Sequence, residues 1–128
     1  NPERARKSVD EAVNILIHSS FSTLIYPEGT RSETGDLLPF KKGGFILAIR
    51  SQLPIVPITI IGAGNVLPKR SFTFNKGQIK VIIDKPISTQ NLAADNKEEL
   101  IASCRNTINK NLICNSDSGQ IEYELSSI

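Results

Sequence analysis

The loop at residues 26–32 contains the residue types that bind a phosphorylated alcohol. Its Arg31 guanidinium presents a planar fork of donors that can bind two phosphate oxygens at once. Glu28 can orient Arg31 or accept a hydrogen bond from a substrate hydroxyl, and Gly29 allows a turn without steric cost. Thr30 adds a hydroxyl. We therefore expect Glu28, Gly29, Thr30 and Arg31 to line an anion site; the alternative is a solvated turn with a surface ion pair.

A second basic group follows this loop. Lys41 and Lys42 directly precede Gly43 and Gly44, where a helical pattern begins. A helix N-terminus attracts anions, and glycines permit the close approach of another backbone. Lys41 and Lys42 are therefore candidate anion-binding residues, the alternative being that their ammonium groups are only solvated.

Helical and strand-like patterns alternate through the first half of the chain. Apolar residues at helical spacing predict a helix from residue 1 to residues 18–20. We expect a short strand over Ser22–Tyr26, ended by Pro27, and a second helix over Gly43–Gln52. The segment Leu53–Ile61 is apolar without clean alternation, which indicates a strand covered on both faces.

The second half repeats this alternation. Gly77–Asp84 is predicted to be a strand, and Asp95 with Glu98 forms a capping-box pattern for a helix that ends near Cys114. A short edge strand is expected over Ile121–Leu125. Helices that alternate with apolar strands indicate an α/β fold, in which a layered sheet is flanked by helices.

Composition narrows the possible partners. Fifteen basic and 13 acidic residues leave a net charge of +2, and only two tyrosines, five phenylalanines and no tryptophan could stack on bases. Nucleic-acid binding is therefore not expected. Cys104 and Cys114 lie too far apart along a predicted helix to form a disulfide, and with one histidine they make no zinc site.

Three motifs, in this order, resemble the 1-acylglycerol-3-phosphate O-acyltransferase (lysophosphatidic acid acyltransferase) family. They are Tyr-Pro-Glu-Gly-Thr-Arg-Ser at 26–32, Pro-Phe-Lys-Lys-Gly-Gly-Phe at 39–45 and Leu-Pro-Ile-Val-Pro-Ile at 53–58. The resemblance extends over about residues 1–88. It implies the layered sheet of the glycerolipid acyltransferases, and it implies that Glu28, Gly29, Thr30 and Arg31 bind the glycerol phosphate of the acceptor, with Arg31 on the phosphate.

The family's catalytic His-x-x-x-x-Asp motif is not found in this sequence. His18 is the sole histidine, and the residue five positions later is Thr23. We therefore expect no catalytic residue in this chain and a structural or surface role for His18. The resemblance implies that the catalytic pair lies upstream, that the chain is a C-terminal fragment, and that its sheet is incomplete on the N-terminal side. Residues 1–88 would be the C-terminal portion of the acyltransferase domain, 89–114 its terminal helix, and 115–128 a mobile tail.

The resemblance also implies the reaction. The intact enzyme would transfer a fatty acyl group from a thioester, acyl-CoA or acyl-ACP, to lysophosphatidic acid, giving phosphatidic acid, at a membrane surface and with its active site facing the cytoplasm. No cofactor or metal is implied. Two alternatives stay open: another acceptor, such as glycerol 3-phosphate or a different lysophospholipid, and a non-catalytic phosphate- or membrane-binding module. The fragment alone is expected to be inactive.

Overall fold

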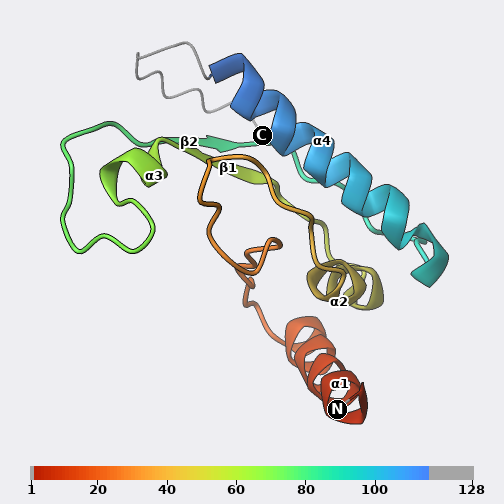
Figure 1. The fold of residues 1–128 in the computed structure, drawn as a ribbon. Coiled ribbons are helices and arrows are strands. Elements are labelled where there is room, and N and C mark those ends of the chain that lie inside the picture. The colour runs from red at the N-terminus through yellow and green to blue at the C-terminus, as the bar shows by residue number, and fades with distance from the viewer. Residues whose placement is uncertain (1, 116–128) are drawn as a thin grey trace.

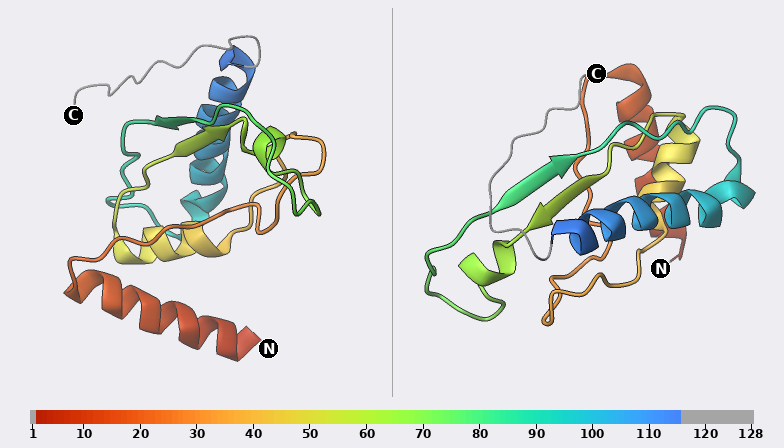
Figure 2. Two further views of the ribbon diagram at one scale, coloured as in Figure 1. Left: turned by 90° about the vertical axis from the view of Figure 1, so that its left-hand side faces the viewer. Right: turned by 90° about the horizontal axis from the view of Figure 1, so that it is seen from above.

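The computed structural model describes residues 2–115 as a mixed fold of helices and a small sheet (Figure 1). Helix α4 lies along one side of the sheet, and α2 lies beneath the sheet and α4 (Figures 1 and 2). In order, the elements are α1 (Pro2–His18), α2 (Gly43–Ser51), β1 (Ile58–Ile61), α3 (Ala63–Val66), β2 (Lys80–Ile83), the 3₁₀ turn η1 (Ala94–Asn96) and α4 (Lys97–Asn115).

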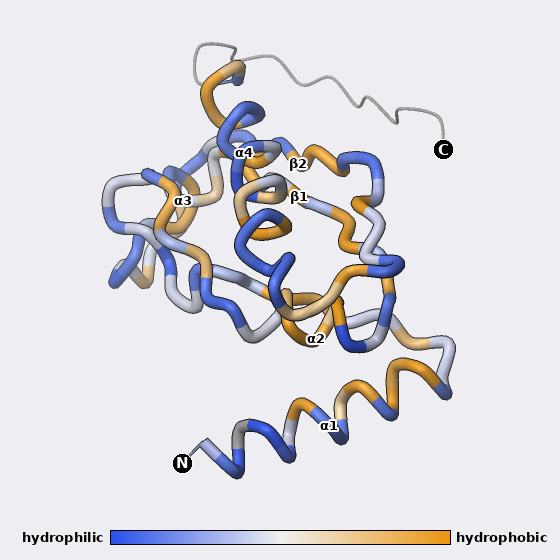
Figure 3. Tube along the Cα trace, turned by 90° about the vertical axis from the view of Figure 1, so that its right-hand side faces the viewer, coloured by the Kyte–Doolittle hydropathy of each residue, from blue (hydrophilic) through white to orange (hydrophobic). Residues whose placement is uncertain are grey.

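Helix α1 confirms the first predicted helix and packs against α2 at one end of the molecule. Its apolar residues recur along its length (Figure 3), and Leu16 is the one that becomes buried. An ion pair between Asp10 and Arg50 joins the two helices at the surface. Because only one apolar side chain of α1 is buried among the described residues, α1 is attached more loosely than the other long helices.

Strands β1 and β2 pair antiparallel, with Ile58 opposite Ile83 and Ile61 opposite Lys80. An isolated bridge between Ile55 and Ile87 continues the pairing beyond Pro57. Both strands are shorter than the sequence predicts. Proline has no N–H to donate to a ladder, so Pro57 limits β1 to four residues.

The expectation that this strand is covered on both faces is wrong. Thr59 is 1% exposed beneath α4, whereas Ile58 and Ile60, on the opposite face, are 40% and 47% exposed. Side chains alternate across a strand, so a single covering helix buries only every second residue. Continuous apolar sequence therefore overstates the burial of β1.

The predicted strand Ser22–Tyr26 is also wrong, because these residues form no ladder within the described chain. Leu24 and Tyr26 are 69% and 68% exposed. A strand is defined by hydrogen bonds to a neighbouring strand, and the β-rich composition of this segment cannot supply that partner.

The core lies between α2 and α4. Phe45 and Ile49 of α2 meet Leu100 and Cys104 of α4, and all four are no more than 5% exposed. Phe40 stacks on Phe45 with ring centroids 6.2 Å apart. Burying one side chain of this size contributes about 1.5–3 kcal/mol, so these contacts hold α2 against α4.

Helix α4 is predicted correctly, but its start and end differ in detail. The expected Asp95–Glu98 capping box does not form; instead, Asn96 Oδ1 accepts the Ala93 N–H at 2.9 Å. Asn115, placed by sequence in a mobile tail, is the last residue of α4, and Lys80 Nζ donates to its Oδ1 at 2.7 Å. Residues 116–128, with the predicted strand Ile121–Leu125, lie outside the described residues. Within residues 2–115, none of the helices combines the length and apolar character required to cross a bilayer.

Candidate functional site

The 26–32 loop turns sharply at Gly29. The Gly29 N–H donates to the Tyr26 carbonyl at 3.0 Å, and Gly29 has φ of +71°. Only glycine adopts this left-handed conformation without steric cost. The glycine in the predicted anion site is therefore required by the shape of the loop.

Glu28 and its neighbour Pro27 bond this loop to the segment that precedes α2. Glu28 Oε2 accepts the Leu38 N–H at 2.8 Å, and the neighbouring Pro27 carbonyl accepts the Lys41 N–H at 2.8 Å. These bonds hold residues 27–28 against the segment that leads into α2. The sequence suggested that Glu28 orients Arg31 or accepts a bond from a substrate hydroxyl. In the structure its Oε2 accepts the Leu38 N–H, so Glu28 helps to fix the shape of the loop.

Lys41 crosses directly over the glycine turn. A β-carbon at Gly29 would lie 2.7 Å from Lys41 Nζ and 2.8 Å from its Cε, so the absence of a side chain leaves room for the lysine. The lysine ammonium therefore lies against the loop that carries Thr30 and Arg31. Among the described residues, no ion pair neutralises it.

Lys42 lies elsewhere. Its Nζ is 2.8 Å from Glu98 Oε1 on α4, and both side chains are more than half exposed. The hydrogen bond from Lys42 holds the pKa of Glu98 below its usual value, since it stabilises the charged carboxylate. The structure thus brings Lys41 to the loop and directs Lys42 to a surface ion pair with α4.

Arg31 is exposed at the end of the loop, as is Thr30. Across residues 2–115, no carboxylate forms an ion pair with the Arg31 guanidinium. Its donors are therefore free for an anion from solution. Arg31 belongs to this loop, and the Lys41 ammonium lies against Gly29, two residues before Arg31, so two cations border one turn. This arrangement suits a doubly charged phosphate monoester.

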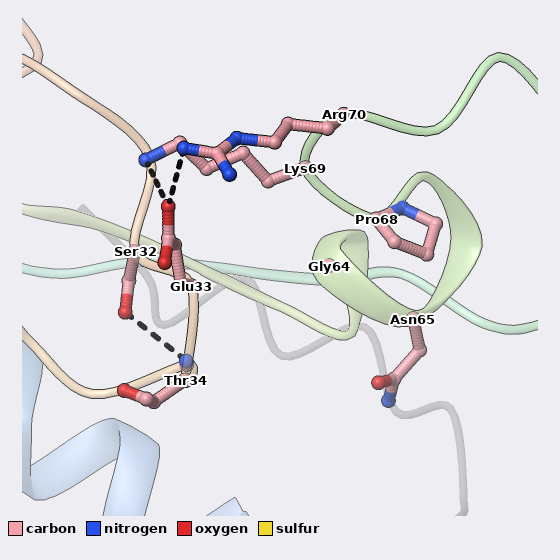
Figure 4. Close-up of a pocket in the computed structure, with 9 residues that line it drawn as sticks. Ser32, Glu33, Thr34, Gly64, Asn65, Pro68, Lys69 and Arg70 are labelled. Atoms are coloured by element: carbon pink, nitrogen blue, oxygen red, sulfur yellow. Dashed lines mark hydrogen bonds and ion pairs between the residues drawn. The ribbon is translucent and has the colours of Figure 1, made fainter.

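A cleft of about 400 Å³ begins at the residue after Arg31. One wall is Ser32–Gly35, and the other comes from Gly64, Asn65 and Pro68–Arg70 (Figure 4). The Glu33 carboxylate lies between two cations, 3.3 Å from Lys69 Nζ and 3.4 Å from an Arg70 guanidinium nitrogen. Sequence reasoning missed this cleft; its one signal was the basic Pro68-Lys69-Arg70 turn, which gave no hint of the loop it faces.

His18 lies at the end of α1, with Nδ1 2.9 Å from the Asn14 carbonyl oxygen of the preceding turn. This bond to its own helix accords with the expected surface role. In the described part of the chain, no group of three histidine, cysteine or acidic side chains could hold a metal ion.

Comparison with known proteins identifies relatives of this fold and sequence. The acyltransferase family profile matches residues 1–61. A chloroplastic 1-acyl-sn-glycerol-3-phosphate acyltransferase from Brassica napus is 42% identical over 96 residues, which are 73% of this chain and 28% of that protein. The human beta form of 1-acyl-sn-glycerol-3-phosphate acyltransferase is 37% identical over 89 residues, 70% of this chain and 32% of that protein.

A solved structure shares the fold. The crystal structure of the 1-acyl-sn-glycerophosphate (LPA) acyltransferase PlsC from Thermotoga maritima matches with a TM-score of 0.79 and 25% identity. The match covers 90% of this chain and 46% of that protein. The chain therefore spans about a third of the length of the two relatives described above and less than half of the solved one.

Proposed function

The chain belongs to the acyltransferase family, and from this premise we propose that it provides the acceptor-phosphate loop of a lysophosphatidic acid acyltransferase. The observation that carries the proposal is that Lys41 Nζ lies against Gly29 on the loop that carries Arg31, and that Glu28 bonds this loop to the Leu38 backbone. Relatives that share this part of the sequence are named for 1-acyl-sn-glycerol 3-phosphate as acceptor.

Each residue of the loop has a distinct role in this proposal. Arg31 binds two oxygens of the acceptor phosphate, and Lys41 adds a point charge beside them. Thr30 offers a hydroxyl to the glycerol phosphate. Glu28 and Gly29 are positioning residues, because they fix the backbone that carries Arg31.

The chemical step itself requires residues beyond this sequence. The acceptor hydroxyl attacks the carbonyl carbon of an acyl thioester, a new C–O bond forms, the C–S bond breaks, and the thiol leaves as phosphatidic acid is released. A His-x-x-x-x-Asp pair, supplied by another part of the protein, takes the hydroxyl proton as general base and returns it to the leaving sulfur. The phosphate loop anchors the acceptor so that its hydroxyl meets the thioester.

The setting of the reaction follows from its substrates. The acceptor is a membrane lipid, so the protein works at a membrane surface, and a soluble thioester, acyl-CoA or acyl-ACP, reaches the active site from the cytoplasm. Residues 1–88 and 89–114 act as one domain, since α4 shares its core with α2.

Acceptor kinetics of the whole protein test the role of Arg31. We expect Arg31→Ala to raise the KM for lysophosphatidic acid about 10- to 100-fold, because a charge-assisted phosphate contact worth about 1.5–3 kcal/mol is lost. Arg31→Lys should recover part of this loss. Lys42→Ala, which removes a neighbouring cation bound to Glu98, should leave KM unchanged.

Two results would count against the proposal. If Arg31→Ala leaves KM unaltered, Arg31 does not bind the acceptor phosphate. If Lys42→Ala raises KM as much as Arg31→Ala, the effect comes from general positive potential and not from a specific contact. Profiling the whole protein on lysophosphatidic acid, glycerol 3-phosphate and other lysophospholipids identifies the acceptor, and transfer to glycerol 3-phosphate alone would replace the acceptor proposed here.

A further inference from the structure

A long central stretch of the chain carries no negative charge. Residues 37–83 contain seven basic residues and no aspartate or glutamate: Lys41, Lys42, Arg50, Lys69, Arg70, Lys76 and Lys80. Elsewhere the chain has eight basic and 13 acidic residues, since 15 less seven is eight. Although the net charge is small, basic and acidic residues are unevenly distributed along the chain, and the positive charge of this stretch attracts anionic surfaces.

Within this stretch, residues 68–77 form what we call the aromatic loop. Phe72 is 100% exposed and Phe74 is 76% exposed. The loop extends from the sheet on the side away from α1 and α2, as Figure 1 and the right-hand view of Figure 2 show. Two phenylalanines, separated by one residue and both exposed on a projecting loop, are unusual for a surface that meets only water.

The base of the aromatic loop is held in place. The Asn75 N–H donates to the Val66 carbonyl at 2.8 Å, and the Asn75 amide donates to the Asn65 carbonyl at 3.1 Å. The Ser71 N–H donates to the Pro68 carbonyl at 3.1 Å, and its hydroxyl contacts Thr73. Both ends of the loop are thus tied down while the two aromatic rings point outward.

Three cations flank the exposed rings. Lys69 and Arg70 precede Phe72, Lys76 follows Phe74, and within residues 2–115 the one carboxylate paired with this group is Glu33. Two positive charges therefore remain uncompensated around an apolar tip. Aromatic and basic residues together are the composition that binds the interface of an anionic bilayer, where rings enter the acyl boundary and cations meet headgroup phosphates.

We propose that the aromatic loop inserts Phe72 and Phe74 into an anionic membrane surface, with Lys69, Arg70 and Lys76 against the lipid headgroups. The inference rests on the proposed function in one respect, that the acceptor is a lipid. The cleft between Ser32 and Arg70 adjoins this loop, and the same insertion would bring the acceptor loop close to the bilayer that holds its substrate.

A local fluorescence reporter tests insertion without depending on acyl transfer. The sequence has no tryptophan, so Phe72→Trp adds a single indole to it. The variant whole protein is mixed with vesicles of phosphatidylcholine and phosphatidylglycerol whose acyl chains are brominated, and the signal of the unsubstituted protein is subtracted. We expect a blue shift and quenching of the added indole. Ala102→Trp, at an exposed position on α4, is the matched control, and the brominated vesicles should not quench its indole.

Charge and apolarity are then tested separately. Lys76→Gln should lower affinity for the anionic vesicles about fivefold, because one basic residue near such a surface contributes this factor. Phe72→Ser should lower it about tenfold on both anionic and phosphatidylcholine vesicles, since it removes buried apolar area.

The outcomes separate this inference from the proposed function. An indole at position 72 that is already blue-shifted without vesicles and insensitive to them would show that protein covers the loop, which overturns the proposal. Equal quenching of Ala102→Trp would also overturn it, because binding would then be general. Loss of insertion with an intact Arg31 effect on KM would reject the aromatic loop and leave the phosphate loop standing.

Discussion

Gly29 shows how one missing side chain can position a cation. Its backbone is left-handed, and Lys41 Nζ lies only 2.7 Å from the place where a β-carbon would be. The sequence predicted that Gly29 serves a turn. It could not predict that Lys41, and not Lys42, lies over this turn, because the directions of two adjacent side chains depend on the exact backbone at the start of α2.

Gly29→Ala therefore has a sharp expected result. The substitution strains the backbone by about 1–2 kcal/mol and also displaces the Lys41 ammonium. Gly35→Ala is the matched control, since Gly35 has φ of +88° but nothing within 4 Å of its added β-carbon. We expect both variants to lower Tm similarly and only Gly29→Ala to raise the KM for lysophosphatidic acid. If Gly29→Ala and Gly35→Ala have the same KM for lysophosphatidic acid, Lys41 does not contribute to acceptor binding.

The two cysteines should differ in reactivity. Burial raises the pKa of Cys104 to about 11, whereas Cys114 is exposed. A raised pKa keeps the thiol neutral, so Cys104 should resist iodoacetamide at pH 8 until the protein unfolds, while Cys114 reacts in the folded state. Mass spectrometry of the labelled peptides measures this. Because the unfolded thiol ionises near 9.0, the stability that Cys104 contributes should decline as pH rises from about 9 to 11. Prompt labelling of Cys104 in the folded protein would contradict its burial.

At the scale of elements, the periodic helices were predicted more accurately than the strands: β1 and β2 lie within predicted strand segments but are shorter, and Ser22–Tyr26 forms no ladder in the described chain. The spacing of apolar residues gave α1, α2 and α4 nearly to the residue, since a helix satisfies its own backbone. The segment Ser22–Tyr26 has the composition of a strand but lacks a ladder in the described chain. Its partner, and the helix that covers one face of β1, are long-range features that local sequence does not encode.

Asn111 joins α4 to the sheet through two polar contacts. Its Nδ2 donates to Thr59 Oγ1 at 3.0 Å and to Asp84 Oδ2 at 2.7 Å. Thr59 is 1% exposed, so its hydroxyl has little access to water. We expect Asn111→Ala to lower the free energy of unfolding by about 1–3 kcal/mol, as measured by urea titration.

Asn106, on the same helix, provides the comparison. It is exposed, and Asn106→Ala should change stability by less than about 0.5 kcal/mol. If the two alanine variants unfold at the same urea concentration, the bridge from α4 to Thr59 contributes nothing measurable.

At the scale of the whole molecule, stability should be uneven. The four buried core residues come from α2 and α4, whereas Leu16 is the one apolar side chain of α1 that is buried among those the structure describes. Amide hydrogen exchange should therefore be faster along α1 than along α2 and α4, because α1 can detach without opening the core. Equal protection of all three helices would show that α1 belongs to the same cooperative unit.

The far end of α2 has a consequence for the phosphate loop. Gln52 caps this helix, donates through its amide to the Leu92 carbonyl at 3.2 Å and accepts the Asn91 N–H at 2.7 Å. A nine-residue helix is a stiff rod about 13 Å long, with Lys41 just before its other tip. The turn at residues 91–92 thus holds the C-terminal end of α2, and the opposite end of this helix determines the position of Lys41. A shift of this turn should therefore move the Lys41 ammonium relative to Gly29, although the two places are one helix length apart.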